Sequence, residues 1–145
     1  MKPDRLDWQI IELLRKDGRT SNSEIARQLN IAEGTVRMRV KRLCKAGVFR
    51  ISGQINPEFL IDHQLITIGI KVKESKSLEK TLYKIAKLEH VSFAAITSGR
   101  YDIIAQVLVD SNKGLINFLT QSLAKIQEIS STETFVMLKT VNSWI

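Results

Sequence analysis

Residues 22–45 constrain the fold more than any other stretch, because they read as two short helices joined by a tight turn. The second helix carries Val36, Val40 and Leu43 at i, i+4, i+7 spacing, which places them on one face. Ala26 is small enough to let the first helix cross the second closely. The interior of this pair is predicted to consist of Ile25, Leu29, Ile31, Val36, Val40 and Leu43.

The face of the second helix opposite Val36 is polar and basic. A helix with an apolar back and a cationic front suits the negatively charged groove of double-stranded DNA, although such helices are also common as solvated surfaces. Arg37 could form a bidentate hydrogen-bonded contact with a guanine, whereas Lys41, Arg42 and Lys45 are suited to contact phosphates. The predicted DNA-contacting residues are Ser23, Thr35, Arg37, Met38, Lys41, Arg42 and Lys45.

Two residues of this helix could serve the structure of the domain instead of contacting DNA. Arg39 points toward the edge of the apolar stripe, where a salt bridge within the domain is as plausible as a DNA contact. Cys44 follows Leu43 and is predicted to lie near the core. As the single cysteine of the chain it excludes an internal disulfide and favours a reducing compartment.

The charge of the chain is unevenly distributed. Residues 1–50 hold 12 Lys and Arg against 6 Asp and Glu, whereas residues 51–145 hold 10 against 9. This asymmetry indicates a polyanionic partner at the end that carries the helix pair. No apolar run approaches the roughly 18 residues that a membrane span needs, and no signal peptide precedes Asp4. We therefore expect a cytoplasmic protein that does not contact membranes.

The flanking segments complete an N-terminal domain. Asp4 or Asp7 can begin a first helix that ends near Lys16. After Gly47, apolar residues alternate with polar ones as far as Ile55, which predicts a strand and a winged helix-turn-helix with a reduced wing. The predicted divisions are a helix-turn-helix domain at 1–50, a strand and linker at 51–63, and a second domain at 64–145.

The second half changes period and predicts an α+β fold. Strands are expected at 65–72, 91–97, 101–109 and 132–141, with helices at 77–88 and 111–126 capped by Ser77 and Ser111. The order β-α-β-β-α-β is that of a ferredoxin-like domain, in which both helices cover one face of the sheet.

The uncovered face of this sheet is predicted to be apolar. Alternation places Ile104 and Leu108 on that face and Tyr101 on the opposite one, with Ile103. Ala94 and Ile96 are assigned to the uncovered face as well. Because an apolar sheet face must be covered, a second copy of the chain is the simplest partner, and dimerisation would pair the two basic helices.

The segment between the expected strands at 91–97 and 101–109 carries varied polar groups. Arg100 or backbone amides could hold the carboxylate of an amino acid, and Asp102 its ammonium group. The alternative is an ordinary hairpin turn in which Asp102 accepts backbone N–H groups. The candidate ligand-binding residues are Thr97, Ser98, Gly99, Arg100, Tyr101 and Asp102, with Thr132 and Thr134 on the last strand.

An enzyme is not predicted. His63 and His90 are isolated, and no Cys or carboxylate cluster has metal-ligand spacing. The chain has no glycine-rich phosphate loop and no nucleophile elbow. We expect no catalytic residues, no metal and no cofactor.

Over nearly its whole length the chain resembles the Lrp/AsnC family of prokaryotic transcription regulators. The order and spacing of the shared positions carry the resemblance. They are Leu6-Asp7, Ile10-Ile11, Asp17-Gly18-Arg19, Ile25-Ala26, Thr35-Val36-Arg37, Arg39-Val40, Arg42-Leu43, Gly47-Val48, Asn56-Pro57, Thr97, Gly99 and Tyr101-Asp102. Ala32 departs from the family's frequent Ser at the start of the recognition helix, and Ile61 stands where a Gly commonly follows Leu60.

The resemblance implies a DNA-binding domain followed by a ligand-sensing domain. It also implies dimers that assemble further, commonly into octamers, and a small effector, such as an amino acid, bound between dimers near Gly99. The expected function is sequence-specific regulation of transcription. Two alternatives stay open: an architectural DNA-binding protein without an effector, and a metabolite sensor that acts through a protein partner.

Overall fold

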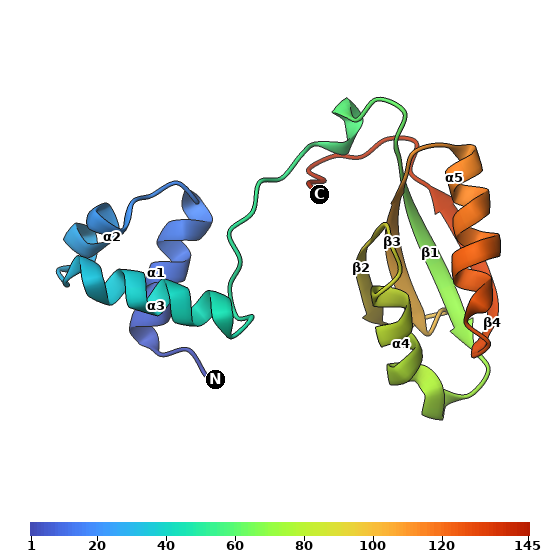
Figure 1. Ribbon diagram of the computed structural model, residues 1–145, viewed down its shortest axis with the longest axis horizontal. Coiled ribbons are helices and arrows are strands. Elements are labelled where there is room, and N and C mark those ends of the chain that lie inside the picture. Colours follow the sequence, from blue (N-terminus) through green and yellow to red (C-terminus); the bar gives the residue numbers. More distant parts are fainter. The chain divides into compact units, whose positions relative to one another are not determined.

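The computed structural model describes residues 1–145, which form two compact units, Met1–Gly53 and Gln54–Ile145. The predicted boundaries at residues 50 and 63 bracket this division. Figure 1 shows a helical first unit and a second unit that combines a sheet with helices.

The N-terminal unit contains α1 (Arg5–Lys16), α2 (Asn22–Leu29) and α3 (Glu33–Lys45). Of the predicted interior, Ile25, Val36 and Leu43 are fully buried, and Leu29, Ile31 and Val40 are partly buried against the core. Ala26 is buried where α2 meets α3. Ala32 precedes α3 without a side-chain cap, as expected from its methyl group.

Helix α1 begins with a reciprocal cap. The Asp4 carboxylate accepts the Asp7 N–H at 2.8 Å, and the Asp7 carboxylate accepts the Asp4 N–H at 3.0 Å. Asp4 is thus the N-cap, and Asp7 lies in the first turn. This arrangement satisfies two N–H groups that a helix start otherwise leaves without partners.

Two predictions about this unit are wrong. Residues 49–53 form no strand, and of the expected strand only Ile55 pairs, exchanging two backbone hydrogen bonds with Ile145 at 2.8 and 3.1 Å. A single pair cannot continue as a ladder, because Pro57 follows at once in a short 3₁₀ turn (Pro57–Phe59). Cys44 is exposed rather than near the core, because Leu43 already occupies the buried position of that turn of α3.

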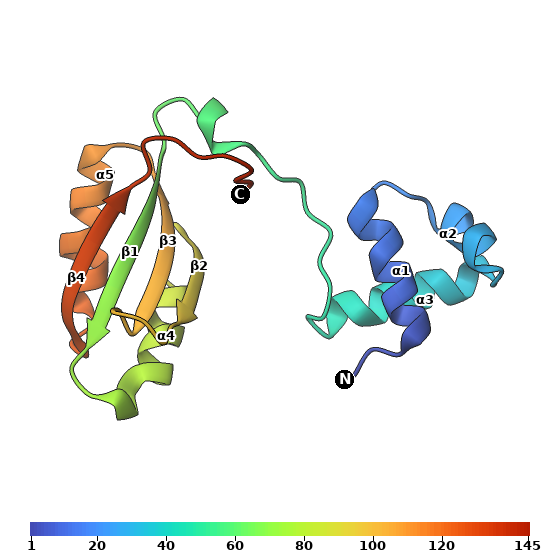
Figure 2. The ribbon, with the colours of Figure 1, turned by 180° about the vertical axis from the view of Figure 1, so that it is seen from behind.

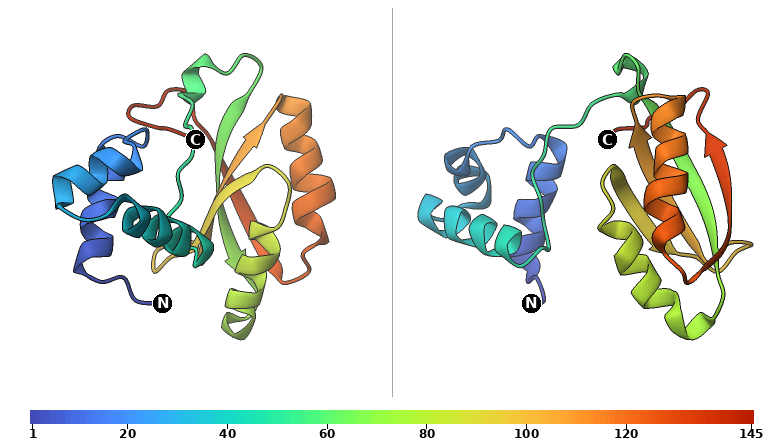
Figure 3. Two further views of the ribbon diagram at one scale, coloured as in Figure 1. Left: turned by 60° about the vertical axis from the view of Figure 1, so that its left-hand side comes forward. Right: turned by 45° about the vertical axis from the view of Figure 1, so that its right-hand side comes forward.

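The second unit is a four-stranded antiparallel sheet in the order β2-β3-β1-β4. Its strands are β1 (Gln64–Val72), β2 (Val91–Ile96), β3 (Ile103–Val109) and β4 (Ile129–Val136). Its helices are α4 (Leu78–Ala86) and α5 (Asn112–Asn117), and α5 continues through a π-helical turn (Phe118–Ser122) and a 3₁₀ turn (Leu123–Lys125). Figure 3 shows both helices on one face of the sheet, which confirms the predicted α+β ferredoxin-like fold.

Several element ends differ from the predictions. Ser77 does not cap α4, because its hydroxyl donates to the Glu74 carbonyl at 2.7 Å, and α4 ends at Ala86 instead of residue 88. Strand β4 begins at Ile129 instead of residue 132 and ends at Val136, and one further backbone hydrogen bond joins the Met137 N–H to the Leu65 carbonyl of β1 at 3.0 Å. Ser111 does cap α5, accepting the Gly114 N–H at 3.0 Å.

The strand register decides which side chains lie under the helices. Ile66, Ile68 and Ile70 of β1 are fully buried and lie opposite Val107, Ala105 and Ile103 of β3. Ala94 and Ile96 pair with Ala105 and Ile103, so both lie on this helix-covered face and not on the uncovered one as predicted. The bulge between Val91 and Phe93 shifts the alternation of β2 and explains the difference.

The uncovered face, which we call the open face, is seen in Figure 2 with the strands in front of the helices. Phe93 of β2 is 51% exposed and Phe135 of β4 is 41% exposed, so this face presents large apolar side chains to solvent. By register, the open face consists of Phe93, Ala95, Ile104, Gln106, Leu108, Leu65, Thr67, Gly69, Lys71, Ser131, Glu133 and Phe135. Most of this face is apolar or uncharged, and its charged residues, Lys71 and Glu133, both lie near one end.

Candidate DNA-binding surface and ligand loop

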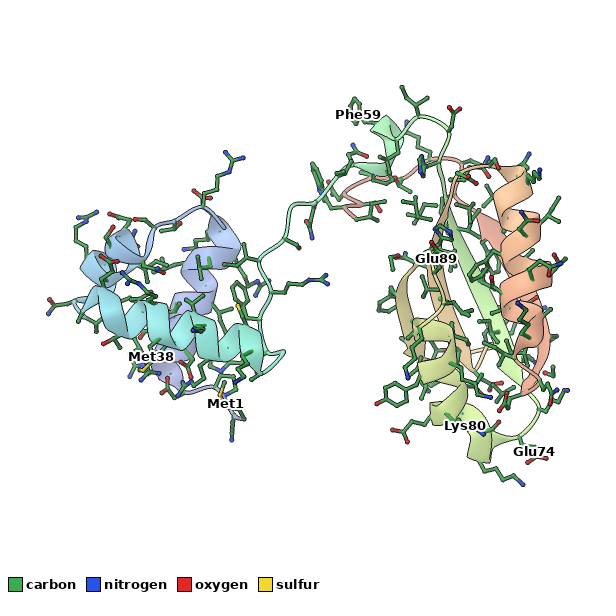
Figure 4. The ribbon with its side chains drawn as sticks, viewed as in Figure 1. Met1, Met38, Phe59, Glu74, Lys80 and Glu89 are labelled. Carbon is green, nitrogen blue, oxygen red and sulfur yellow. The ribbon has the colours of Figure 1, made fainter.

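Helix α3 presents a cationic surface on the side away from the core. Met38 is 61% exposed, and Figure 4 labels it on α3. Arg37, Lys41 and Lys45 are also exposed, whereas Val36 and Leu43 on the other side are fully buried. The structure therefore brings four of the seven predicted DNA-contacting residues onto one accessible stripe of one helix.

Arg37 is held by a partner on its own helix. Its guanidinium donates to the Glu33 carboxylate one turn earlier, at 2.5 Å, and both side chains are largely exposed. An exposed i, i+4 pair is worth only about 0.3–0.5 kcal/mol. Arg37 can therefore exchange Glu33 for a base edge or a phosphate at small cost.

The other predicted DNA-contacting residues are less available for DNA, because they are partly buried or contact other side chains of the unit. Thr35 is half-buried at the start of α3, and the exposed Ser23 hydroxyl lies 2.9 Å from that of Ser21, the cap of α2. The Arg42 guanidinium donates to both carboxylate oxygens of Asp7, at 2.8 and 2.9 Å. Arg42 was predicted to contact DNA, but it is paired with Asp7 within the unit.

Arg39 forms the salt bridge that was one of its two interpretations. Its guanidinium donates to Asp4 at 2.6 Å and to Asp7 at 2.8 Å. Asp7 is only 1% exposed, so one buried carboxylate of α1 is shared by two arginines of α3. This cluster fixes how α1 crosses α3, and hence how the exposed stripe of α3 is oriented within the unit.

The ionisation of this cluster follows from its contacts. Burial by itself would raise the pKa of Asp7, but the Asp4 N–H, the Arg39 hydrogen bond and the Arg42 charge outweigh it, and the pKa is lowered. The hydrogen bond from Arg39 is the main cause of the lowered pKa of Asp4. The same carboxylates raise the pKa of Arg39.

We predict that the N-terminal unit loses stability in acid through these two carboxylates. A carboxyl whose pKa is lower in the folded state stabilises that state above its unfolded pKa and loses this effect as the pH falls through the folded value. We therefore expect the free energy of unfolding of this unit to decrease as the pH falls below about 4. Urea titrations followed by Trp8 fluorescence across this range, in a Trp144→Phe background, measure it, and a constant free energy would contradict the prediction.

The candidate ligand loop, residues 97–102, is closed at its base. The Thr97 N–H donates to the Asp102 carbonyl at 2.9 Å, and the Thr97 hydroxyl contacts the Tyr101 carbonyl. The Asp102 N–H donates to the Ile70 carbonyl at 2.9 Å, and the Asp102 carboxylate accepts the Val72 N–H at 2.8 Å. Asp102 therefore accepts a backbone N–H group, as expected if the segment is an ordinary hairpin turn.

The tip of the loop is open to ligands. Ser98, Gly99 and Arg100 are exposed, and no backbone N–H of these residues has a protein partner. Thr132 and Thr134 lie on the opposite face of the sheet from Tyr101. They pair with Ile70 and Ile68, so they belong to the helix-covered face. The structure thus separates the last-strand candidates from the loop.

Tyr101 lies on the face opposite to the one predicted. Strand β3 begins only at Ile103, so the alternation does not extend to residue 101. The Tyr101 ring instead lies over Gly69 of β1, and its hydroxyl contacts Glu133 of β4. Sequence reasoning missed Gly69 and Glu133, and a glycine in the middle of an otherwise β-branched strand was the available signal.

No group of three or more His, Cys, Asp or Glu side chains could hold a metal ion. No helix has the length and apolar character required to cross a membrane.

Comparison with known proteins agrees with both units. Residues 3–50 match a family model described as winged helix-turn-helix DNA-binding, and residues 65–143 match the Lrp/AsnC ligand binding domain. An uncharacterised HTH-type transcriptional regulator of Pyrococcus furiosus is 39% identical, with 97% of this chain and 95% of that protein covered. The regulatory protein AsnC of Escherichia coli is 34% identical, with 94% and 90% covered.

A solved structure supports the same assignment. The structure of Escherichia coli AsnC superposes with a TM-score of 0.72 and 31% identity, covering 97% of this chain and 95% of that one. These relatives are regulators and not enzymes, in agreement with the sequence analysis. The chain therefore belongs to the Lrp/AsnC family of DNA-binding transcriptional regulators.

Proposed function

We propose that this regulator recognises a specific operator sequence by placing α3 in the major groove. The observation that carries the proposal is the exposed stripe of Arg37, Met38, Lys41 and Lys45 on the side of α3 away from its buried residues. Arg37 is the residue best suited to read a base, because its guanidinium is exposed and only loosely paired. Lys41 and Lys45 suit phosphates, which add affinity without sequence information.

Two copies are proposed to pair through the open face of the sheet. Helices cover only the other face, and Phe93, Phe135 and Leu108 remain accessible to a partner. A self-complementary pairing buries the same patch on both copies and supplies two α3 helices for a two-fold operator. Assembly beyond the dimer, into the octamer that the family resemblance implies, is part of this proposal.

The loop at residues 97–102 is proposed to bind a small effector, an amino acid or a related metabolite. Its exposed tip offers the Arg100 guanidinium and free backbone N–H groups for a carboxylate. An effector that binds one assembly state better than another would shift the population of states and so change operator affinity.

We predict that Arg37→Ala relaxes recognition of the operator. The variant should lose roughly 1–3 kcal/mol of discrimination, about 5- to 150-fold, against DNA mutated at the contacted base pair. Lys41→Ala should weaken binding to every sequence and reduce the dependence of affinity on salt. Fluorescence anisotropy with DNA from upstream of its own gene and with scrambled DNA, over a salt series, measures both effects.

The matched control is Lys80→Ala in α4, which removes the same charge from the other unit. Lys80 is 70% exposed and lies 3.6 Å from Glu128, and Figure 4 labels it. It should leave the operator preference unchanged. If wild-type protein binds operator and scrambled DNA equally, with a steep salt dependence, the effector-independent architectural function is the correct one.

A further inference from the structure

The Tyr101 side chain physically joins the ligand loop to the open face. Its ring covers Gly69, and a side-chain carbon at residue 69 would come within 2.6 Å of the ring carbons Cγ and Cδ2. Contacts that close are not tolerated, so only glycine at this position allows the ring to lie flat on β1. Gly69 is flanked by Ile104 of β3 and Glu133 of β4, both of which belong to the open face.

Contacts on β4 hold the ring in place. The Tyr101 hydroxyl donates to the Glu133 carboxylate, and the ring meets Phe135 edge-on, with centroids 6.1 Å apart and an interplanar angle of 72°. The Arg100 guanidinium lies 5.5 Å from the Tyr101 ring centroid and 3.7 Å from the Glu133 carboxylate. Loop residues therefore make up part of the open-face surface itself.

Movement at the tip of the loop cannot leave Tyr101 unaffected. Only Ser98, Gly99 and Arg100 separate Thr97 from Tyr101, and the hydrogen bond from the Thr97 N–H to the Asp102 carbonyl closes the loop behind them. A molecule that pulls Arg100 away from Glu133 also removes the cation above the Tyr101 ring.

We propose that Tyr101, laid on Gly69, makes the ligand loop part of the surface through which two copies pair, so that loop ordering and pairing are linked. The inference rests on the proposed pairing through the open face. Linkage is reciprocal, so pairing must stabilise the closed loop by the same free energy with which a closed loop stabilises pairing. The linkage can thus be tested without knowing the effector.

The experiment is residue-resolved amide hydrogen exchange on the full chain, paired and unpaired. The amides of Thr97 and Asp102 report on the loop, because their hydrogen bonds close its base. Leu108→Glu provides the unpaired chain, because residue 108 lies on the open face at the end of β3 far from Tyr101. We expect both amides to exchange at least about tenfold faster in this variant than in the paired wild type.

Two further variants make the result specific to Tyr101. Gly69→Ala displaces the ring, so its Thr97 and Asp102 amides should exchange fast even at concentrations where the chain is paired. Tyr101→Phe keeps the ring but removes the contact with Glu133, and should give an intermediate rate. Phe93→Glu, at an already exposed position, replaces Leu108→Glu if that variant does not fold.

The outcomes distinguish a failure of this linkage from a failure of the proposed pairing through the open face. If Leu108→Glu and Phe93→Glu are unpaired while the loop amides exchange at the wild-type rate, the linkage is overturned and pairing through the open face stands. If both variants remain paired, pairing through the open face is itself wrong, and the linkage fails with it.

Discussion

Asp7→Asn is expected to destabilise the N-terminal unit by about 3 kcal/mol. Asp7 is nearly inaccessible and accepts hydrogen bonds from Arg39, Arg42 and the Asp4 N–H. The amide keeps the shape of the side chain but leaves two guanidinium groups without their shared charge, and the Arg39 Nε is already without a partner. The effect lies at the lower end for a broken buried ion pair because Arg42 remains half exposed to water.

Urea unfolding followed by Trp8 fluorescence measures this effect, in a Trp144→Phe background so that only α1 reports. The matched control is Glu24→Gln, which breaks an exposed ion pair with Arg27 on α2. Arg27 and Gln28 lower the pKa of Glu24 to about 2, yet the pair is exposed and its loss should change stability little. Equal effects of the two variants would show that the Asp7 cluster does not hold α1 on α3.

Leu108→Glu is expected to weaken pairing of the chain by a factor of about a thousand or more. In a two-fold interface the substitution places a carboxylate on each copy, and each would lose water without gaining a cation. The cost is several kcal/mol for each buried charge, and two charges act together. Within one copy, the cations on or beside the open face are Lys71 and Arg100, and both lie at the opposite end of the sheet from Leu108.

Sedimentation equilibrium of wild type and variant measures the dissociation constant. Ile116→Glu is the matched control, because Ile116 is also an accessible apolar residue but belongs to α5, which covers the other face. We expect this control to pair as the wild type does. A Leu108→Glu chain that dissociates no more readily would remove the open face as the pairing surface.

Elements that depend on near neighbours could be predicted from the order of the residues alone. The i, i+4, i+7 stripe of α3 places Val36 and Leu43 inside because a helix repeats every 3.6 residues, whatever lies around it. The order of strands and helices in residues 64–136 could be predicted for the same reason, since period 2 and period 3.6 are local properties. The same helical period places the cationic residues on the exposed side of α3, and these residues are the basis of the proposed function.

Features that join distant residues could not be predicted in this way, because they depend on how the chain folds. Arg42 pairs with Asp7 across 35 positions, and nothing near Arg42 in the sequence indicates a buried carboxylate on α1. The face of Tyr101 was unpredictable because strand alternation holds only while the ladder continues, and β3 begins two residues later. The bulge in β2 moved Ala94 and Ile96 to the helix-covered face, because register is a property of two paired strands and not of either one alone.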